Sequence, residues 1–293
     1  MTRAAHCSIA LSPVLALVLA CTAAVAAAYP SPDAAVTALA AAVAKDDVAA
    51  IEAVLGRGSR KLADSGDAVA DKTGRANFTA AFDAKHSVET SGDTATLVIG
   101  TDDYPFPIPL VHAGDGWSFD VKAGAREILD RRIGRNELTA IDVCRAIVDA
   151  ERDYAAEFAQ YAGKFVSDPG KKNGLYWPAT AGGPESPLGP LVASARAQGY
   201  HGHHTPYHGY YFKLLAGQGP HAADGARTYL VKGRMIGGFA IVAYPAKWGD
   251  SGVMSFTVNQ DGIVHERNLG RDTSRIAARI TRYDPDPDWK EVK

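Results

Sequence analysis

Apolar and polar residues alternate along the last third of the chain, and this alternation predicts a small antiparallel sheet. Three runs show the pattern, and the apolar side chains expected on one face are Tyr210, Phe212 and Leu214, then Phe239, Ile241 and Ala243, and then Met254, Phe256 and Val258. Glycine and proline residues separate the runs. The Asp-Gly pair at 261–262 supplies the positive φ of a tight hairpin, so we expect two strands to meet there.

A helical period comes before these strands. From Asn136 to about Phe165, apolar residues recur mostly at three- and four-residue steps, with charged residues on the other side. A shorter helix over 125–132, ended by Gly134, is expected just before it. Because a sheet must bury its apolar face, we expect the long helix to cover the sheet.

The region 29–124 has helical patterns first and strand patterns afterwards. Residues 31–33 (Ser-Pro-Asp) combine an N-cap, a proline at the first helical position and an acid at the positive end of the helix dipole. A second helix is predicted to begin after Asp46-Asp47 and to end at Gly56, and a third covers 76–82.

Strand patterns follow over 86–90, 94–100 and 116–121. Between them, 104–112 reads YPFPIPLVH, and its alternate prolines remove N–H donors from one edge only. We therefore predict an edge strand there that pairs with 116–121 on its other side. Helices followed by a curved antiparallel sheet are the layout of small cone-shaped domains similar to nuclear-transport-factor-like folds.

These patterns predict an α+β protein of two domains, because the chain is longer than one ordinary core needs. The first domain is expected over 29–124 and the second over 125–293. A long loop rich in glycine and proline, 167–206, interrupts the second domain. Loops of this length are typically functional or loosely ordered.

Residues 1–28 predict an export signal, since the apolar run 9–20 is too short to span a bilayer. Two processing routes are open. Small residues at 26–28 fit ordinary cleavage, whereas 17–21 (LVLAC) fits a bacterial lipobox in which Cys21 would carry a lipid. We expect a periplasmic protein, or an outer-membrane lipoprotein if Cys21 is modified.

Charge and cysteine content narrow the choice of partners. The chain has 31 basic and 33 acidic residues, interspersed along its length, which argues against nucleic acid as a partner. Membrane contact is expected only through a lipid on Cys21. After ordinary cleavage Cys144 is the single cysteine, so no disulfide framework can form within the chain. Its place on an apolar helical stripe predicts a buried, inert thiol.

The densest set of metal-ligating side chains is His201, His203, His204 and His208. His204 and His208 have the spacing of one helical face, but Pro206 lies between them and argues against a helix. No glutamate is placed as in a zinc protease. The run predicts either a zinc site or a polar loop that binds metal only adventitiously.

Five aromatic residues flank the same loop: Tyr176, Trp177, Tyr207, Tyr210 and Tyr211. They are expected either to join the core or to line a groove for a peptide or a glycan. The segment 249–252 (Gly-Asp-Ser-Gly) approaches the serine-hydrolase motif, yet it joins two predicted strands, where Ser and Asp are ordinary turn formers. We assign no catalytic residue.

Several longer strings resemble an exported bacterial family catalogued as domain of unknown function 2950. They are RRIGRNELTAID (131–142), GLYWP (174–178), SPLGPL (186–191), YHGYYFKLLAGQGP (207–220) and GRMIGGFAIVAYPAKWGDSGVMSFTVNQDG (233–262). This resemblance covers nearly the whole mature chain and implies no established activity.

A second resemblance concerns the C-terminal half alone. Asn136-Glu137, GYYF (209–212), FAIVAYP (239–245) and DGIV (261–264) are similar to the globular part of type IV pilins and pseudopilins. The resemblance implies a helix lying across a small antiparallel sheet. A pilin's membrane-spanning helix half is absent here, so only the architecture is expected to carry over.

The sequence thus favours a non-catalytic envelope protein, a structural or interaction module whose partner is an unknown envelope protein or peptide. One alternative is a metal-dependent hydrolase that uses the cluster His201–His208 with zinc as its cofactor. Another is a small-ligand-binding protein with a cavity in the N-terminal cone. Whether the protein is an enzyme stays open, and the candidate residues favour a protein that is not an enzyme.

Overall fold

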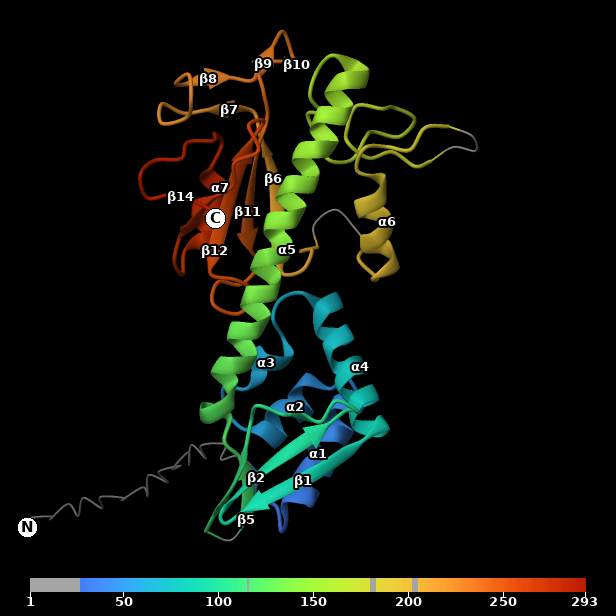
Figure 1. Ribbon diagram of the computed structural model, residues 1–293, viewed down its shortest axis with the longest axis vertical. Coiled ribbons are helices and arrows are strands. Elements are labelled where there is room, and N and C mark those ends of the chain that lie inside the picture. The colour runs from blue at the N-terminus through green and yellow to red at the C-terminus, as the bar shows by residue number, and fades with distance from the viewer. Residues whose placement is uncertain (1–26, 115, 180–182, 202–204) are drawn as a thin grey trace, which may run out of the picture.

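The structure, a computed structural model, describes residues 27–114, 116–179, 183–201 and 205–293. Helices and antiparallel sheets alternate along the chain, so the predicted α+β class is confirmed. Figure 1 shows one sheet near each end of the molecule, with the long helix α5 (Val121–Phe158) extending from one to the other. Residues 1–26 of the predicted export signal, Cys21 included, lie outside the described residues.

Four helices open the described chain: α1 (Pro32–Ala44), α2 (Val48–Leu55), α3 (Arg60–Ala63) and α4 (Ala68–Ala84). The predicted caps are present. The Ser31 hydroxyl accepts a hydrogen bond from the amide of Ala34 (3.1 Å), and the Asp47 carboxylate accepts one from the amide of Ala49 (3.0 Å). The third predicted helix is part of α4, which begins earlier and is capped by Asp67. None of the α4 residues is buried. Its first turns therefore need no apolar stripe, and the sequence shows no helical period from which the start could be predicted.

The first sheet contains β1 (His86–Ser91), β2 (Thr94–Ile99), β3 (Tyr104–Pro105), β4 (Leu110–Ala113) and β5 (Gly116–Phe119). Its order is β1-β2-β4-β5, with β3 paired to β2 as well. The first hydrophobic cluster is formed mainly by residues of α1, α2, this sheet and the segment between β3 and β4. It includes Val36, Leu39, Ile51, Leu55, Leu97, Ile108, Leu110 and Phe119.

The prediction of one edge strand over 104–112 is wrong. The segment is broken into β3 and β4, and β4 lies inside the sheet between β2 and β5. Phe106 donates to the carbonyl of Leu97 in β2 (2.7 Å) and not toward 116–121. The predicted pairing with 116–121 is confirmed for the second half of the segment, where β4 pairs with β5. Pro107 and Pro109 lack the N–H groups of a continuous ladder, so regular pairing stops before them. It resumes at Leu110, where the backbone can again bond on both sides.

Helix α5 is continuous, so the predicted break at Gly134 and the predicted end at Phe165 are both wrong. An interior glycine weakens a helix by only about 1 kcal/mol, which the packing at either end of α5 outweighs. The helix ends at Phe158, and Ala159 after it has a left-handed backbone (φ 51°). Phe165 continues the apolar spacing because it packs on the same core from a non-helical segment.

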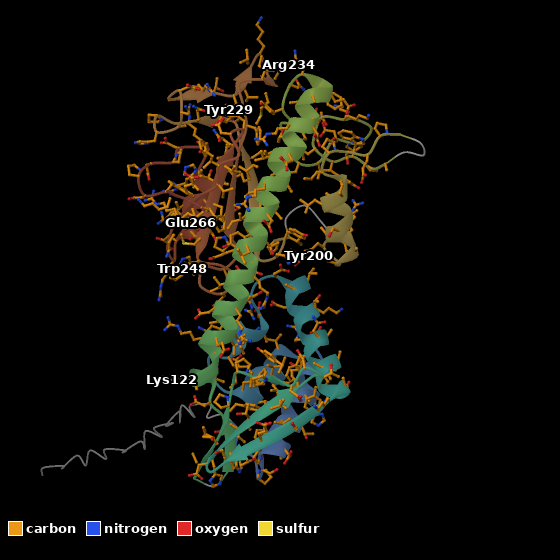
Figure 2. The ribbon with its side chains drawn as sticks, viewed as in Figure 1. Lys122, Tyr200, Tyr229, Arg234, Trp248 and Glu266 are labelled. Carbon is orange, nitrogen blue, oxygen red and sulfur yellow. The ribbon has the colours of Figure 1, made fainter. Side chains whose placement is uncertain are left out.

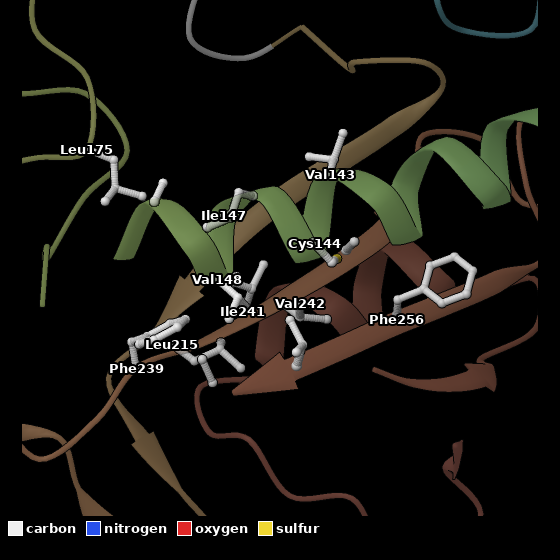
Figure 3. Packing of buried hydrophobic residues seen from close by; sticks show 14 of the residues in the cluster. Val143, Cys144, Ile147, Val148, Leu175, Leu215, Phe239, Ile241, Val242 and Phe256 are labelled. Atoms are coloured by element: carbon white, nitrogen blue, oxygen red, sulfur yellow. The ribbon is translucent and has the colours of Figure 1, made fainter. Parts of the chain in front are cut away.

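The second sheet is antiparallel throughout, in the order β14 (Lys290–Glu291), β13 (His265–Asn268), β12 (Met254–Asn259), β11 (Ala240–Pro245) and β6 (Tyr210–Leu215). Ile241 lies opposite Leu214 and Val258, so the predicted apolar face is confirmed. Gly262, between β12 and β13, has the positive φ expected of the hairpin (82°). Figure 3 shows α5 lying across these strands, with its apolar side chains in the second hydrophobic cluster.

The opposite face of this sheet is covered as well, by α7 (Thr273–Arg279). The ammonium group of Lys213 donates to the carbonyls of Ala277 (3.2 Å) and Ala278 (3.1 Å). With one helix on each face, all four residues from Ala240 to Ala243 are fully buried. The remaining elements are α6 (Gly189–Ala197) and two short strand pairs, β7 (Gly217–Gln218) with β8 (Arg227–Thr228) and β9 (Leu230–Val231) with β10 (Arg234–Met235).

The predicted domain boundary, between residues 124 and 125, falls in the first turns of α5. The first cluster draws on residues 35–119 and the second on residues 140–283. Helix α5 joins the two clusters without a linker. Within the described residues, none of the helices combines the length and apolar composition needed to span a bilayer.

The continuity of α5 can be tested at Gly134. A Cβ added there would meet no atom within 4 Å, and its φ is not positive. Gly134→Ala should therefore raise the free energy of unfolding by about 1 kcal/mol, since alanine is the better helix former by roughly that amount. Urea denaturation followed by circular dichroism measures the change. A loss of stability would indicate a helix end at Gly134.

The matched control is Gly124, in the same helix. A Cβ at Gly124 would clash with the carbonyl oxygen of Pro107. Gly124→Ala should lower the free energy of unfolding by about 1–3 kcal/mol, as overpacking typically does.

Candidate functional site

An open groove of about 860 Å³ lies between α5 and α6, and we call it the α5–α6 groove. Most of its lining is apolar or aromatic. The residues are Val143, Ile147, Phe165, Val166, Tyr176, Leu188, Leu191, Val192, Ala195, Arg196, Tyr200, His201, Thr205, Tyr207 and Phe212. They come from α5, from both ends of the long loop, from α6 and from β6. The predicted loop therefore forms one wall of a groove whose volume is in the range of ligand-binding pockets.

One wall is held together by backbone hydrogen bonds. The amide of Tyr176 donates to the carbonyl of Phe165 (2.8 Å), and the amide of Ser167 donates to the carbonyl of Tyr176 (2.8 Å). This pairing fixes the aromatic rings of Phe165 and Tyr176 along the groove. The guanidinium of Arg196 lies over the Tyr176 ring at 5.0 Å, a cation–π contact that puts a positive charge at the rim.

The opposite end of the groove is built from Tyr200 and Tyr207, whose rings meet edge to face at 4.9 Å. The Tyr200 hydroxyl donates to the carboxylate of Asp67 (3.0 Å). Burial raises the pKa of Tyr200, so this phenol stays protonated and remains a hydrogen-bond donor. Tyr207 is fixed by backbone bonds in both directions with Tyr210 (2.8 and 3.1 Å).

The five predicted aromatic residues do not share one environment. Tyr176 and Tyr207 line the groove. Trp177 and Tyr210 are buried in the second cluster, where the Tyr210 hydroxyl donates to the carbonyl of Met254 (2.8 Å). Tyr211 is paired across the sheet with Tyr244, on the face away from α5.

Sequence reasoning missed three aromatic residues of the groove: Phe165, Tyr200 and Phe212. The helical period places Phe165 in the long helix, and the alternation places Phe212 in the core of the sheet. Tyr200 sits in the loop without any periodic pattern around it. Only the fold brings these three side chains to one place.

The predicted histidine cluster is described only in part. His201 lines the groove, whereas His208 lines a separate cavity beside α4. His203 and His204 lie outside the described residues. Among the residues that the structure describes, no group of three or more His, Cys, Asp or Glu side chains is placed to hold a metal ion. The zinc site stays a prediction that depends on His203 and His204.

Two potential nucleophiles are held in structural positions. Cys144 is a buried free thiol, as predicted, and burial raises its pKa to about 12. Ser251 is fully buried, and its hydroxyl accepts from the amide of Lys247 (2.9 Å) and donates to the carbonyl of the same residue (3.1 Å). This is the turn-forming role expected from the sequence.

A buried acid fixes the chain where it leaves α5 for the groove. Glu151 is fully buried, and its Oε2 accepts from the amide of Ala162 (2.7 Å). Its Oε1 has no hydrogen-bond partner among the described residues. Desolvation raises the pKa of Glu151 to about 8, with the hydrogen bond from Ala162 opposing the shift. The side chain positions the turn that leads to Phe165.

Glu151 should make stability depend on pH. The unfolded side chain loses its proton near pH 4.3, but the folded one keeps it up to about pH 8. The folded state therefore binds more protons between these values, and the free energy of unfolding should fall as the pH rises through them. Glu151→Gln keeps an acceptor for Ala162 but cannot ionise, so its stability relative to the wild type should grow from pH 5 to pH 9.

Urea unfolding at pH 5, 7 and 9 measures this difference. Glu157→Gln is the matched control, because Glu157 lies on the same helix with an exposed side chain. Parallel pH profiles for the wild type and Glu151→Gln would contradict the buried-acid interpretation.

The family described as "Protein of unknown function (DUF2950)" matches residues 26–292, which confirms the family indicated by the sequence strings. No curated protein and no solved structure matches the chain.

Proposed function

The chain belongs to this family of unknown function, DUF2950, and from the geometry of its groove we propose a non-catalytic binding module of the bacterial envelope. In this proposal the α5–α6 groove holds an apolar peptide segment of another envelope protein. The observation that carries the proposal is an open space of about 860 Å³ lined mostly by apolar and aromatic side chains.

The groove chemistry favours a peptide with apolar side chains. Aromatic walls offer large apolar contact areas, and the rings of Tyr176 and Tyr207 also present hydroxyl groups for backbone hydrogen bonds. Arg196 adds a cation at the rim, next to Tyr176. An amphipathic segment would lay its apolar side chains between α5 and α6 and keep its polar side in solvent.

The location outside the cytoplasm is also a proposal. The family match begins at residue 26, close to the end of the predicted signal at 1–28. This supports a removable segment before the shared part of the family. The packing of α5 against β11 and β12 supports a pilin-like arrangement of the C-terminal half.

A charge in the groove tests the binding proposal. Val192 lines the groove from α6, whereas Ala193 is the next residue of the same helix and is exposed. Peptides selected from a random library on the mature protein should be rich in large apolar residues. Val192→Glu should raise the dissociation constants of these peptides by about tenfold or more, because an apolar contact is replaced by a charge.

Ala193→Glu is the matched control and should leave the peptide dissociation constants unchanged, as fluorescence anisotropy can measure. A selection that yields no binding peptide, or peptides that both variants bind equally well, would contradict a peptide site in the groove.

Processing can be tested at Cys21. Lipidation predicts a wild-type protein in the membrane fraction and a Cys21→Ser protein in the soluble periplasmic fraction. Ordinary cleavage predicts a soluble wild type whose mature N-terminus, by mass spectrometry, is Tyr29. Recovery of the uncleaved chain in the cytoplasm would rule out export.

A further inference from the structure

A second cavity, of about 640 Å³, lies where α4 and α5 meet the first two helices, and we call it the α4–α5 cavity. Its inner surface is apolar and includes Leu39, Ile51, Leu55, Phe78, Ile108 and Ile128. Most of its walls are helical, and the first sheet contributes only the segment between β3 and β4. The cavity is separate from the α5–α6 groove, although Tyr200 (labelled in Figure 2) lines both.

The outer part of the α4–α5 cavity is rich in arginine. Arg75 is paired with Asp46 and also donates to the carbonyl of Ala63 (2.6 Å). Arg132 donates to the carbonyls of two α3 residues, Lys61 (2.8 Å) and Leu62, which fixes its guanidinium near the cavity. These acceptors are neutral carbonyls, and the acids that act on the charge of Arg132 are Asp71, Asp250 and Asp64, none of which is hydrogen-bonded to it.

Arg135 lies one helical turn further along α5, and its side chain is exposed. Its guanidinium has no hydrogen-bond or ion-pair partner among the described residues. A guanidinium presents a fork of N–H donors that matches a carboxylate in two-point contact. Arg135 is therefore placed to take an anionic group at the mouth of the cavity.

One acid lines the described cavity, Asp71, against three arginines. The Asp71 carboxylate accepts from the amide of Ser65 (2.8 Å), and burial raises the pKa of Asp71, which disfavours its negative charge. Arg75 is paired with Asp46, and Arg132 has Asp71, Asp250 and Asp64 in its surroundings. The guanidinium of Arg135 is the one in this lining without a hydrogen-bond or ion-pair partner among the described residues, at the polar end of a cavity whose inner surface is apolar.

We propose that the α4–α5 cavity binds a small amphipathic acid, with its hydrocarbon body on the apolar surface and its carboxylate at Arg132 and Arg135. The volume is within the range of about 300–1,000 Å³ that is usual for small-ligand sites. This binding activity goes beyond the peptide site proposed for the groove and does not depend on it.

Isothermal titration of the mature protein with decanoate, below its micelle concentration, tests the proposal. One decanoate should bind per chain, and 1-decanol should bind more weakly because it lacks the carboxylate. Arg135→Gln should lower the affinity for decanoate by about fivefold, because one charge-assisted contact is lost. It should leave the affinity for 1-decanol unchanged. Arg126→Gln is the matched control, an exposed α5 arginine outside the cavity lining.

A variant that fills part of the cavity provides a second test of the proposal. Gly74 lines the cavity from α4, and a Cβ added there would meet no atom within 4 Å. Gly74→Leu should lower the affinity for decanoate by about tenfold or more, because the leucine side chain occupies part of the apolar space. Gly134→Leu is the control, because it replaces a helical glycine of equally open surroundings that does not line the cavity.

Any of the following results would overturn the proposal: no decanoate binding, equal binding of decanoate and 1-decanol that Arg135→Gln leaves unchanged, or decanoate binding that Gly74→Leu leaves intact. Loss of decanoate in Val192→Glu alone would place the site in the groove and also overturn it. Gly74→Leu should leave unchanged the affinity for the peptides selected on the groove. The peptide proposal and the decanoate proposal can therefore be contradicted independently of each other.

Discussion

Helix α5 is the constraint on which the rest of the structure depends. Its first turns pack into the first cluster, where Gly124 lies against the backbone at Pro107, and its second half buries an apolar stripe on the second sheet. Glu137 in the middle of α5 accepts from the amides of Val253 and Met254 (both 2.9 Å), which fixes where β12 begins. Both candidate sites use this helix as a wall, so the geometry of each follows from its straight course between the clusters.

A buried aspartate provides the second link between the clusters. Asp67 is almost fully buried, and its carboxylate accepts from the amide of Ala70 (3.0 Å), the hydroxyl of Tyr200 (3.0 Å) and the amide of Gly209 (2.7 Å). A buried acceptor is tolerable when several donors replace water, and here the donors come from both halves of the chain. The same contact caps α4 and positions the ring of Tyr200 between the groove and the cavity.

The local parts of this fold could be predicted from the sequence, because alternation, caps and turn residues act over a few positions. Strands β6, β11 and β12 of the second sheet and the helices after Ser31 and Asp47 are of this kind. The start of α4 could not be predicted, since an exposed helix shows no apolar stripe, and the continuity of α5 was hidden by the glycine at 134. The groove and the cavity depend on contacts such as Asp67 with Tyr200, which are 133 positions apart, and no local pattern reports them.

The same two links bear on how ligands would bind. A continuous helix has no loop at which the two clusters could hinge, and the Asp67 contact ties α4 to the segment before β6 on the other side. The walls of the groove and of the cavity are therefore largely fixed before any ligand arrives. Binding to a preformed site orders fewer side chains and backbone segments, so more of the apolar contact area contributes to affinity. In the binding roles proposed for the groove and the cavity, preformed walls would favour reversible capture of apolar chains, because little conformational freedom is lost on binding.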